Sequence, residues 1–255
     1  MVEACRSLVP AAEAEAATAG AVTPQAAEER LLSSALRRWA LARYCGTPAA
    51  ALRFTRGPHG KPELLQEPLS GARRLSFSVA HTAGALLCAV ACAPLGVDVE
   101  QRDRGSPGLA TRLAARYFTS AEQAALAALP EPARAGAFLQ LWTLKEAYVK
   151  ALGRGIAAAP LASFAISLHD APGTPSRRVE LDHMGSPHAS ADGEPVPAWQ
   201  LALLALPGGA HVAALAAGAA PGAGPLRLRL WRTELQEEGE AQAVEVLAVG
   251  RTQRA

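Results

Sequence analysis

The chain has 255 residues, of which 50% are hydrophobic and 19% charged, and its formal net charge is +2. A chain of this length and apolar content can bury a core, as one large domain or as two small lobes, which excludes a disordered protein. The near balance of charge excludes nucleic acid as the main partner, so any anionic ligand must be held by local groups.

The apolar stretches do not predict a membrane span, because Pro and Gly interrupt them well before about 20 residues. Cys88 and Cys92 lie inside an apolar run without paired spacing, which favours buried, reduced thiols. Residues 1–22 are Ala-rich and acidic, unlike a signal or transit peptide, and predict a disordered leader. We expect a cytoplasmic protein, with an organelle such as a plastid or mitochondrion as the open alternative.

The first structured part begins at Thr23, where a capping residue followed by Pro24 predicts a helix that continues to Gly46. Residues 53–64 are rich in turn formers and predict a connection. Three apolar runs with tight breaks then predict successive strands, at residues 74–82, 85–93 and 95–100.

The next part is helical: residues 109–118, a capping box that starts at Thr119 with Glu122 three residues on, and residues 133–153, which end at Gly153. Further strands are predicted at residues 161–168, 198–206 and 211–218, with a loop over residues 171–197.

Both halves thus run from helix to antiparallel strands, which predicts an α+β fold and suggests a duplicated unit. We divide the chain into four parts: the leader 1–22, a first lobe 23–105, a second lobe 106–220 and a C-terminal extension 221–255.

Two carboxylates lie on the strand of sequence LGVDVE. Alternation sends Val97 and Val99 to one face and Asp98 and Glu100 to the other, about 6.5 to 7 Å apart. A solvated outer face would explain this pattern. The apolar runs on either side instead favour a central strand.

The helix with sequence LWTLKEAYVKALG carries charge beside an apolar stripe. Trp142, Glu146 and Lys150 follow one another at helical spacing, next to the apolar stripe of Leu141, Leu144, Tyr148 and Ala151. A surface ion pair worth a few tenths of a kcal/mol is one interpretation of Glu146 and Lys150. Trp142 at the head of the same stripe favours partial burial.

If strand and helix meet, Asp98, Glu100 and Glu146 converge on one point and need a cation. Hard oxygen ligands favour magnesium over zinc or calcium. Magnesium beside lysines then predicts a phosphate substrate.

These residues resemble the Sfp-type 4′-phosphopantetheinyl transferase family. The resemblance covers roughly residues 28–217 and rests on five segments: GKPEL (60–64), FSVAHT (77–82), GVDVE (96–100), FTSAE (118–122) and WTLKEAYVKALGRG (142–155). The last segment, combined with GVDVE upstream, is the specific part of the match.

The resemblance implies two pseudo-twofold-related lobes, each a small mainly antiparallel sheet with a long helix, and an active site at the lobe interface. It implies a monomer that moves the phosphopantetheine arm of coenzyme A onto a serine of an apo acyl or peptidyl carrier protein, in fatty-acid, polyketide or nonribosomal peptide biosynthesis, and releases adenosine 3′,5′-bisphosphate. No nucleic acid or membrane partner is expected.

The same resemblance assigns the site residues. Asp98, Glu100 and Glu146 would bind Mg²⁺, Lys150 the pyrophosphate and His81 the 3′-phosphate. Looser matches to phosphate-side basic residues are Lys61 and Arg38. Either Glu146 or Lys150 could take the serine proton, and we favour Glu146.

Two features depart from the family. The leader replaces a strand and a basic segment that usually precede the first helix, and Ala80 stands where a serine is common, which removes a hydroxyl worth ~1 kcal/mol. A non-catalytic carrier-protein-binding homologue is therefore the first alternative, and another magnesium-dependent phosphotransferase or phosphohydrolase the second. Exposed arginines between Arg112 and Arg116 are candidates for docking an acidic carrier helix.

Overall fold

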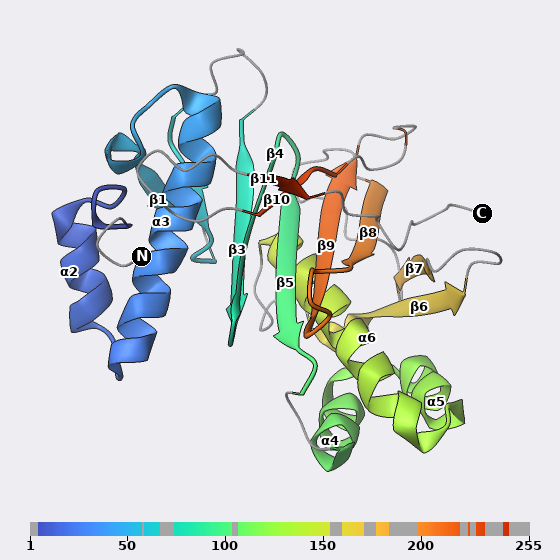
Figure 1. Ribbon diagram of the computed structural model, residues 1–255. Helices are drawn as coiled ribbons and strands as arrows, with labels where there is room; N and C mark the ends of the chain where they lie inside the picture. The colour runs from blue at the N-terminus through green and yellow to red at the C-terminus, as the bar shows by residue number, and fades with distance from the viewer. Residues whose placement is uncertain are drawn as a thin grey trace.

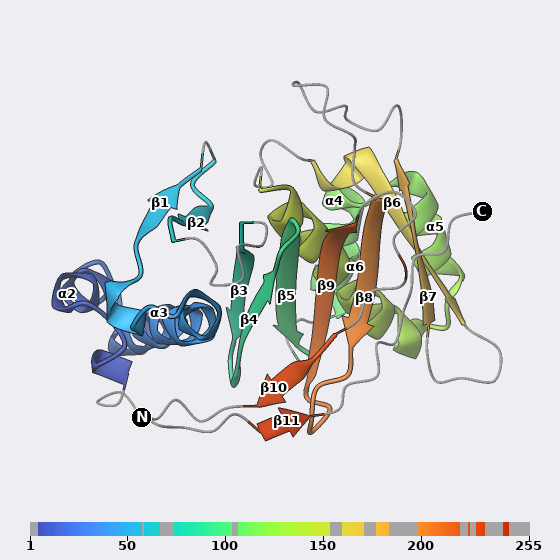
Figure 2. The ribbon, with the colours of Figure 1, turned by 90° about the horizontal axis from the view of Figure 1, so that it is seen from above.

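Figure 1 shows the computed structural model of the chain. The structure describes residues 5–57, 59–66, 74–103, 107–153, 160–170, 177–183, 198–219, 224, 228–232 and 242–244. Seen from above, the helical N-terminal part, the β3–β4 hairpin and the β5–β9–β8 sheet follow one another across the molecule, and helices α4 to α6 lie towards the far side (Figure 2).

The N-terminal part is a pair of packed helices, α2 (Ala11–Ala19) and α3 (Pro24–Cys45). Helix α3 confirms the predicted start, because the Thr23 hydroxyl accepts a hydrogen bond from the backbone N–H of Ala26. It ends at Gly46, whose left-handed φ of 59° suits glycine.

Helix α2 lies where the sequence predicted a disordered leader. Its Glu13 carboxylate accepts a hydrogen bond from Arg37 on α3 at 2.6 Å and from Arg38 beside it. Cys5 and Val9 are buried in the same small core as Leu31 and Ala35 of α3. The Ala-rich composition of this segment gives no sign of these few contacts, which hold the short helix against α3.

Two hairpins follow. A 3₁₀ turn at Ala49–Ala51 precedes β1 (Phe54–Arg56), which pairs with β2 (Pro62–Leu64), so the predicted connection 53–64 contains a short hairpin. Strand β3 (Ser76–Thr82) then pairs with β4 (Ala85–Ala91), as predicted.

The central sheet has the order β5–β9–β8, all antiparallel. Its strands are β5 (Leu95–Gln101), β8 (Ala198–Leu204) and β9 (His211–Ala219). Strand β5 also lies beside β3, where the backbone N–H of Val97 donates to the buried hydroxyl of Ser78 at 3.1 Å. Val97 and Val99 are 2% and 1% exposed, so β5 is buried rather than solvated, but in this sheet it is an edge strand and β9 is the central one.

Three helices follow in this part of the chain, α4 (Pro107–Tyr117), α5 (Ser120–Ala128) and α6 (Glu131–Leu152). Helix α6 covers the sheet, and α4 and α5 pack against α6. The capping box of Thr119 and Glu122 is present at the start of α5. Helix α6 packs against β5 and β9 (Figure 1), and its predicted apolar stripe is buried in the largest core. None of the helices in the described ranges combines the length and the apolar character needed to cross a bilayer.

The remaining strands form small pairs. Strand β6 (Phe164–Asp170), after a 3₁₀ turn at Leu161–Ser163, pairs with β7 (Arg177–His183). The loop predicted over 171–197 is therefore wrong for β7, whose buried Val179 alternates with charged neighbours. The other residues of that loop lie outside the described ranges. Strands β10 (Leu230–Arg232) and β11 (Gln242–Val244) pair within the C-terminal extension.

The described part is thus an α+β structure of helices and small antiparallel sheets, as predicted. The pseudo-twofold relation of two lobes and the domain boundaries stay predictions.

Candidate active site

The site begins with an unusually close approach of β5 to α6 at Gly96. A Cβ atom added to this glycine would lie 2.1 Å from the carbonyl oxygen of Ala147 and 2.3 Å from the backbone nitrogen of Ala151. Only a residue without a side chain allows two backbones to come this close. The contact places the carboxylate of Asp98, two residues further along β5, against the charged stripe of α6.

Asp98 meets Lys150 across this contact. The Lys150 Nζ donates to Asp98 Oδ1 at 2.6 Å, and the side chains are 34% and 8% exposed. Burial raises the pKa of Asp98, and the repulsion by Glu100 adds to it, although the Lys150 ammonium opposes both. The solvated outer face that could have explained the sequence pattern does not apply to Asp98.

Glu146 lies one turn before Lys150 on the same stripe and is partly buried. Burial, followed by repulsion from Asp98, raises its pKa to about 7, while Lys150 opposes the shift and Glu100 adds to it. The charges of Asp98 and Glu100 on β5 thus reach Glu146 on α6. The packing of strand against helix therefore brings the three predicted carboxylates together.

Two oxygens of this cluster have no hydrogen-bond partner among the described residues. They are Asp98 Oδ2 and Glu146 Oε1, and both are buried. A buried carboxylate oxygen without a donor is costly, and a divalent cation is the partner that its charge and hardness suit. The residues therefore fit Mg²⁺.

Glu100 completes the set less directly. No three Asp, Glu, His or Cys side chains of the described part already stand in ligand geometry. Glu100 is partly buried and has interactions of its own. The two unpartnered oxygens, on Asp98 and Glu146, are therefore the first candidates to hold an ion.

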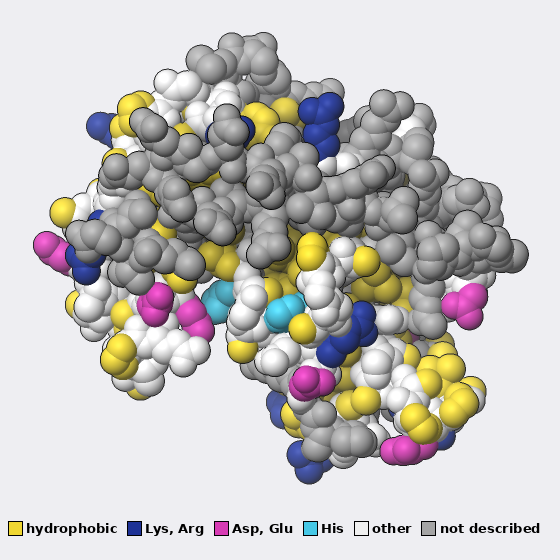
Figure 3. Space-filling model, in the orientation of Figure 1, with side chains coloured by type: hydrophobic (Ala, Val, Ile, Leu, Met, Phe, Trp, Pro, Cys, Tyr) yellow, Lys and Arg dark blue, Asp and Glu magenta, His cyan; other side chains and the backbone are white. Residues whose placement is uncertain are grey.

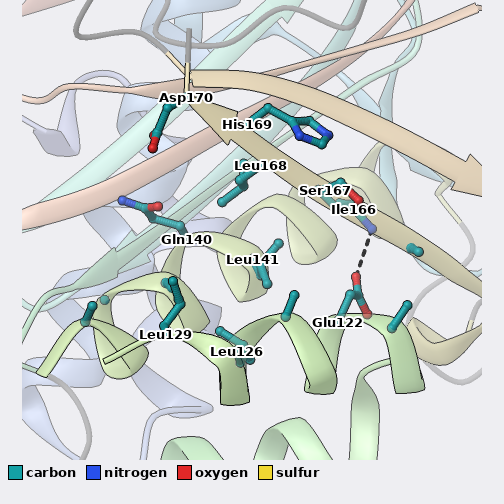
Figure 4. Close-up of a pocket in the computed structure, with 16 residues that line it drawn as sticks. Glu122, Leu126, Leu129, Gln140, Leu141, Ile166, Ser167, Leu168, His169 and Asp170 are labelled. Carbon is teal, nitrogen blue, oxygen red and sulfur yellow. Dashed lines mark hydrogen bonds between the residues drawn. The ribbon is translucent and has the colours of Figure 1, made fainter. Parts of the chain in front are cut away.

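The other lysine of the motif, Lys145, is 0% exposed and faces the core. Its Nζ donates to Glu122 Oε1 at 2.9 Å and to the carbonyls of Leu161 and Phe164, each at 2.6 Å. The same Glu122 oxygen accepts the N–H of Ile166 on β6 at 2.8 Å, a bond drawn in Figure 4. This buried pair ties α5, α6 and β6 together, a structural role that the sequence did not reveal.

His81, the predicted contact to the nucleotide's 3′-phosphate, is exposed at the end of β3. Its Nε2 lies 3.9 Å from Glu29 Oε2 on α3. On the face shown in Figure 3, histidine and acidic side chains border a hollow between the N-terminal helices and the lower helical part.

Lys61 and Arg38, the looser predicted phosphate contacts, are occupied elsewhere. Lys61 Nζ donates to the carbonyls of Leu95 at 2.9 Å and Lys150 at 2.7 Å. Arg38 is 3% exposed and donates to the Glu13 carboxylate and to the carbonyls of Ala49 and Leu52. The contacts of Arg38 hold α3, α2 and the turn after α3 together.

A cavity of about 460 Å³ lies apart from the carboxylates, between α5, α6 and β6 (Figure 4). Asp98, Glu100, Glu146 and Lys150 do not line it, and no Lys or Arg of the described residues does. It therefore lacks the permanent positive charge that would favour a phosphate.

Comparison with known proteins gives one family. Residues 94–214, which include β5 and α6, match the 4′-phosphopantetheinyl transferase superfamily. The 4′-phosphopantetheinyl transferase of Bacillus subtilis is 30% identical over 144 residues, 56% of this chain and 60% of that protein. The 4′-phosphopantetheinyl transferase Sfp of Bacillus subtilis (strain 168) is 28% identical over 143 residues, 56% of this chain and 59% of that protein.

A relative from Nostoc sp., the 4′-phosphopantetheinyl transferase HetI, is 35% identical over 115 residues, 45% of this chain and 47% of that protein. A solved structure, the Thermotoga maritima holo-[acyl-carrier-protein] synthase (AcpS), aligns with 56% of this chain and 68% of that chain at 17% identity, with a TM-score of only 0.35.

The matched part of the chain spans about half to three fifths of the length of these curated relatives. The matches agree with the segments GVDVE and WTLKEAYVKALGRG, which the structure joins at Gly96. Residues 94–214 thus match the 4′-phosphopantetheinyl transferase superfamily, which confirms the resemblance to its Sfp-type members.

Proposed function

We propose that this chain is a Mg²⁺-dependent 4′-phosphopantetheinyl transferase that acts on coenzyme A and an apo acyl or peptidyl carrier protein. One observation carries the proposal: Asp98 on β5 and Glu146 on α6 each have a buried oxygen without a hydrogen-bond partner among the described residues, and the ammonium of Lys150 donates to the other oxygen of Asp98. The family match supports it, because the curated relatives carry this activity in their names.

In the proposed reaction, the carrier serine oxygen bonds to the phosphorus that bears the pantetheine arm. The bond from that phosphorus to the bridging oxygen breaks, and adenosine 3′,5′-bisphosphate leaves. Such a transfer needs alignment and charge neutralisation more than covalent help. Bound Mg²⁺ would supply charge neutralisation at the diphosphate, held by Asp98 and Glu146 with Glu100.

The chain's own residues would do the rest. Lys150 would donate to the diphosphate oxygens and so stabilise the charge that develops there. Glu146, directly or through a water molecule, would take the serine proton. Lys150 is the weaker choice for this step, because an ammonium that donates to Asp98 has no lone pair to offer.

Other parts of the site would bind the two substrates. We place His81 at the 3′-phosphate, and the exposed Arg112 and Arg116 of α4 where an acidic helix of the carrier docks. The proposal also includes two lobes, 23–105 and 106–220, with the site between them. It further includes a monomeric cytoplasmic protein and a biosynthetic role. It does not rest on Arg38, which donates to Glu13 and to the carbonyls of Ala49 and Leu52.

The test is a mass measurement. The protein is incubated with an apo carrier protein, coenzyme A and Mg²⁺, and the carrier is then weighed. A mass gain equal to the phosphopantetheine arm supports the proposal. Binding without a mass gain would identify an inactive homologue, and loss of coenzyme A without carrier modification would identify a hydrolase.

A further inference from the structure

Lys61 lies at the end of the turn between β1 and β2. The turn is closed by a hydrogen bond from the Gly57 N–H to the Lys61 carbonyl at 2.9 Å. From this hairpin the side chain extends to the start of β5 and the end of α6. Its ammonium thus connects the β1–β2 hairpin to the elements that build the carboxylate site.

The two acceptors of Lys61 belong to the two elements of that site. One is the carbonyl of Leu95, the first residue of β5 and three residues before Asp98. The other is the carbonyl of Lys150 itself, in the last turn of α6. A single ammonium therefore bonds to both β5 and α6 beside their close contact at Gly96.

The end of α6 is shaped for this contact. The carbonyls of the last helical turn lack partners within the helix and carry the negative end of its dipole, which favours a cation. Gly153 caps the helix with a left-handed φ of 67° and donates to the same Lys150 carbonyl at 3.2 Å. A Cβ at Gly153 would lie 3.4 Å from Lys61 Cδ, so the lysine stem packs closely on the cap.

We propose that Lys61 is a positioning residue, which ties β5 to α6 and thereby sets Asp98 against Glu146 and Lys150. The family resemblance had suggested that Lys61 contacts a coenzyme A phosphate; in the role proposed here it does not. Two of its three N–H donors are already engaged by backbone carbonyls. This inference rests on the proposed function only where it concerns the metal ion.

The test compares Lys61→Met and Lys61→Arg with a matched control, Arg56→Met. Arg56 lies on the same hairpin and carries the same charge, but it is exposed, and among the described residues it donates only to the Gly60 carbonyl of its own turn. Hydrogen exchange is measured for the amides of β5 and of the last two turns of α6. Mn²⁺ binding to the protein alone is then titrated by electron paramagnetic resonance, and coenzyme A binding by calorimetry.

We expect Lys61→Met to speed exchange in β5 and the end of α6 and to weaken Mn²⁺ binding about tenfold, in the range seen when outer groups that orient metal ligands are removed. The affinity for coenzyme A in the absence of metal should stay within about twofold of wild type, because the Lys61 ammonium does not bind a phosphate. Lys61→Arg should restore most of the protection, and Arg56→Met should change none of the three.

Two results would overturn the assignment. Unchanged exchange in Lys61→Met would show that the tie does not hold the two elements. Weakened coenzyme A binding with normal exchange and normal Mn²⁺ binding would show a phosphate contact instead. Failure of the wild-type protein to bind Mn²⁺ would refute the proposed function, and the exchange data would then decide the role of Lys61 independently.

Discussion

Gly96→Ala is expected to separate β5 from α6 and to disable the site without touching any of its charged groups. The added methyl carbon would meet the carbonyl oxygen of Ala147 at 2.1 Å, the nitrogen of Ala151 at 2.3 Å and the carbonyl carbon of Lys150 at 2.8 Å. All three are backbone atoms of one helix, so no side chain can swing away to make room.

The structure sets the size of the effect. Bringing the shortest contact from 2.1 Å to the lower limit of real Cβ contacts, 3.0 Å, requires a shift of about 0.9 Å between strand and helix. Overpacking of this kind costs about 1–3 kcal/mol, which lowers the melting temperature of a chain of this size by about 2–12 °C. A misplacement of about 1 Å between catalytic groups can also cost about 100-fold in rate.

Two assays measure these effects: thermal unfolding by calorimetry and the rate of carrier mass gain. The matched control is Gly136→Ala, on the same helix α6, where an added Cβ would meet nothing within 4 Å. That change should leave activity unaltered and raise stability slightly, by about 0.5–1 kcal/mol, because alanine favours helix. Gly96→Ala protein with wild-type melting and a wild-type rate would refute the close contact as the basis of the site.

Three further outcomes are expected. Asp98→Asn and Glu146→Gln should each lower the transfer rate more than about 100-fold, which exceeds the loss typical of residues that only orient metal ligands. The far-ultraviolet circular dichroism should not change, and near-normal rates would exclude both residues as metal ligands. Without divalent ions, the melting temperature should fall as the pH rises from about 4.5 to about 7, because the folded state holds the Glu146 proton more tightly than the unfolded state, and Glu146→Gln should flatten this fall. Lys145→Met should cost about 3–5 kcal/mol in urea unfolding because it leaves the buried Glu122 carboxylate without its counter-charge, and adding Glu122→Gln should recover part of the loss. A double variant whose cost equals the sum of the costs of Lys145→Met and Glu122→Gln alone would show that the pair is not coupled.

Local sequence signals predicted most of the elements because each signal acts over a few residues. The Thr23 cap, the Thr119 capping box and the stop at Gly153 are all present in the structure. Alternation on β5 and helical spacing on α6 likewise predicted which side chains share a face. These features follow from backbone geometry and need no knowledge of the fold.

Long-range contacts were not predictable in the same way. Nothing near Glu13 indicates that its partners are Arg37 and Arg38, more than 20 residues later in the chain. The burial of Lys145 depends on Glu122 and on carbonyls that precede and begin β6. The role of Gly96 was hidden for the same reason, because a glycine in a strand pattern signals a close approach only when the approaching helix is known.

The charge balance of the site links its electrostatics to its proposed chemistry. Three carboxylates and Lys150 leave two negative charges when all four groups are ionised, and burial makes that state costly. Without a cation, the cluster lowers this cost by holding a proton on Glu146, whose pKa is raised to about 7. A divalent ion would neutralise the excess fully and would release that proton, since a bound cation favours the ionised carboxylate. The affinity for Mg²⁺ should therefore rise with pH through this range, and the Asp98 oxygen that Lys150 does not use remains available to the ion.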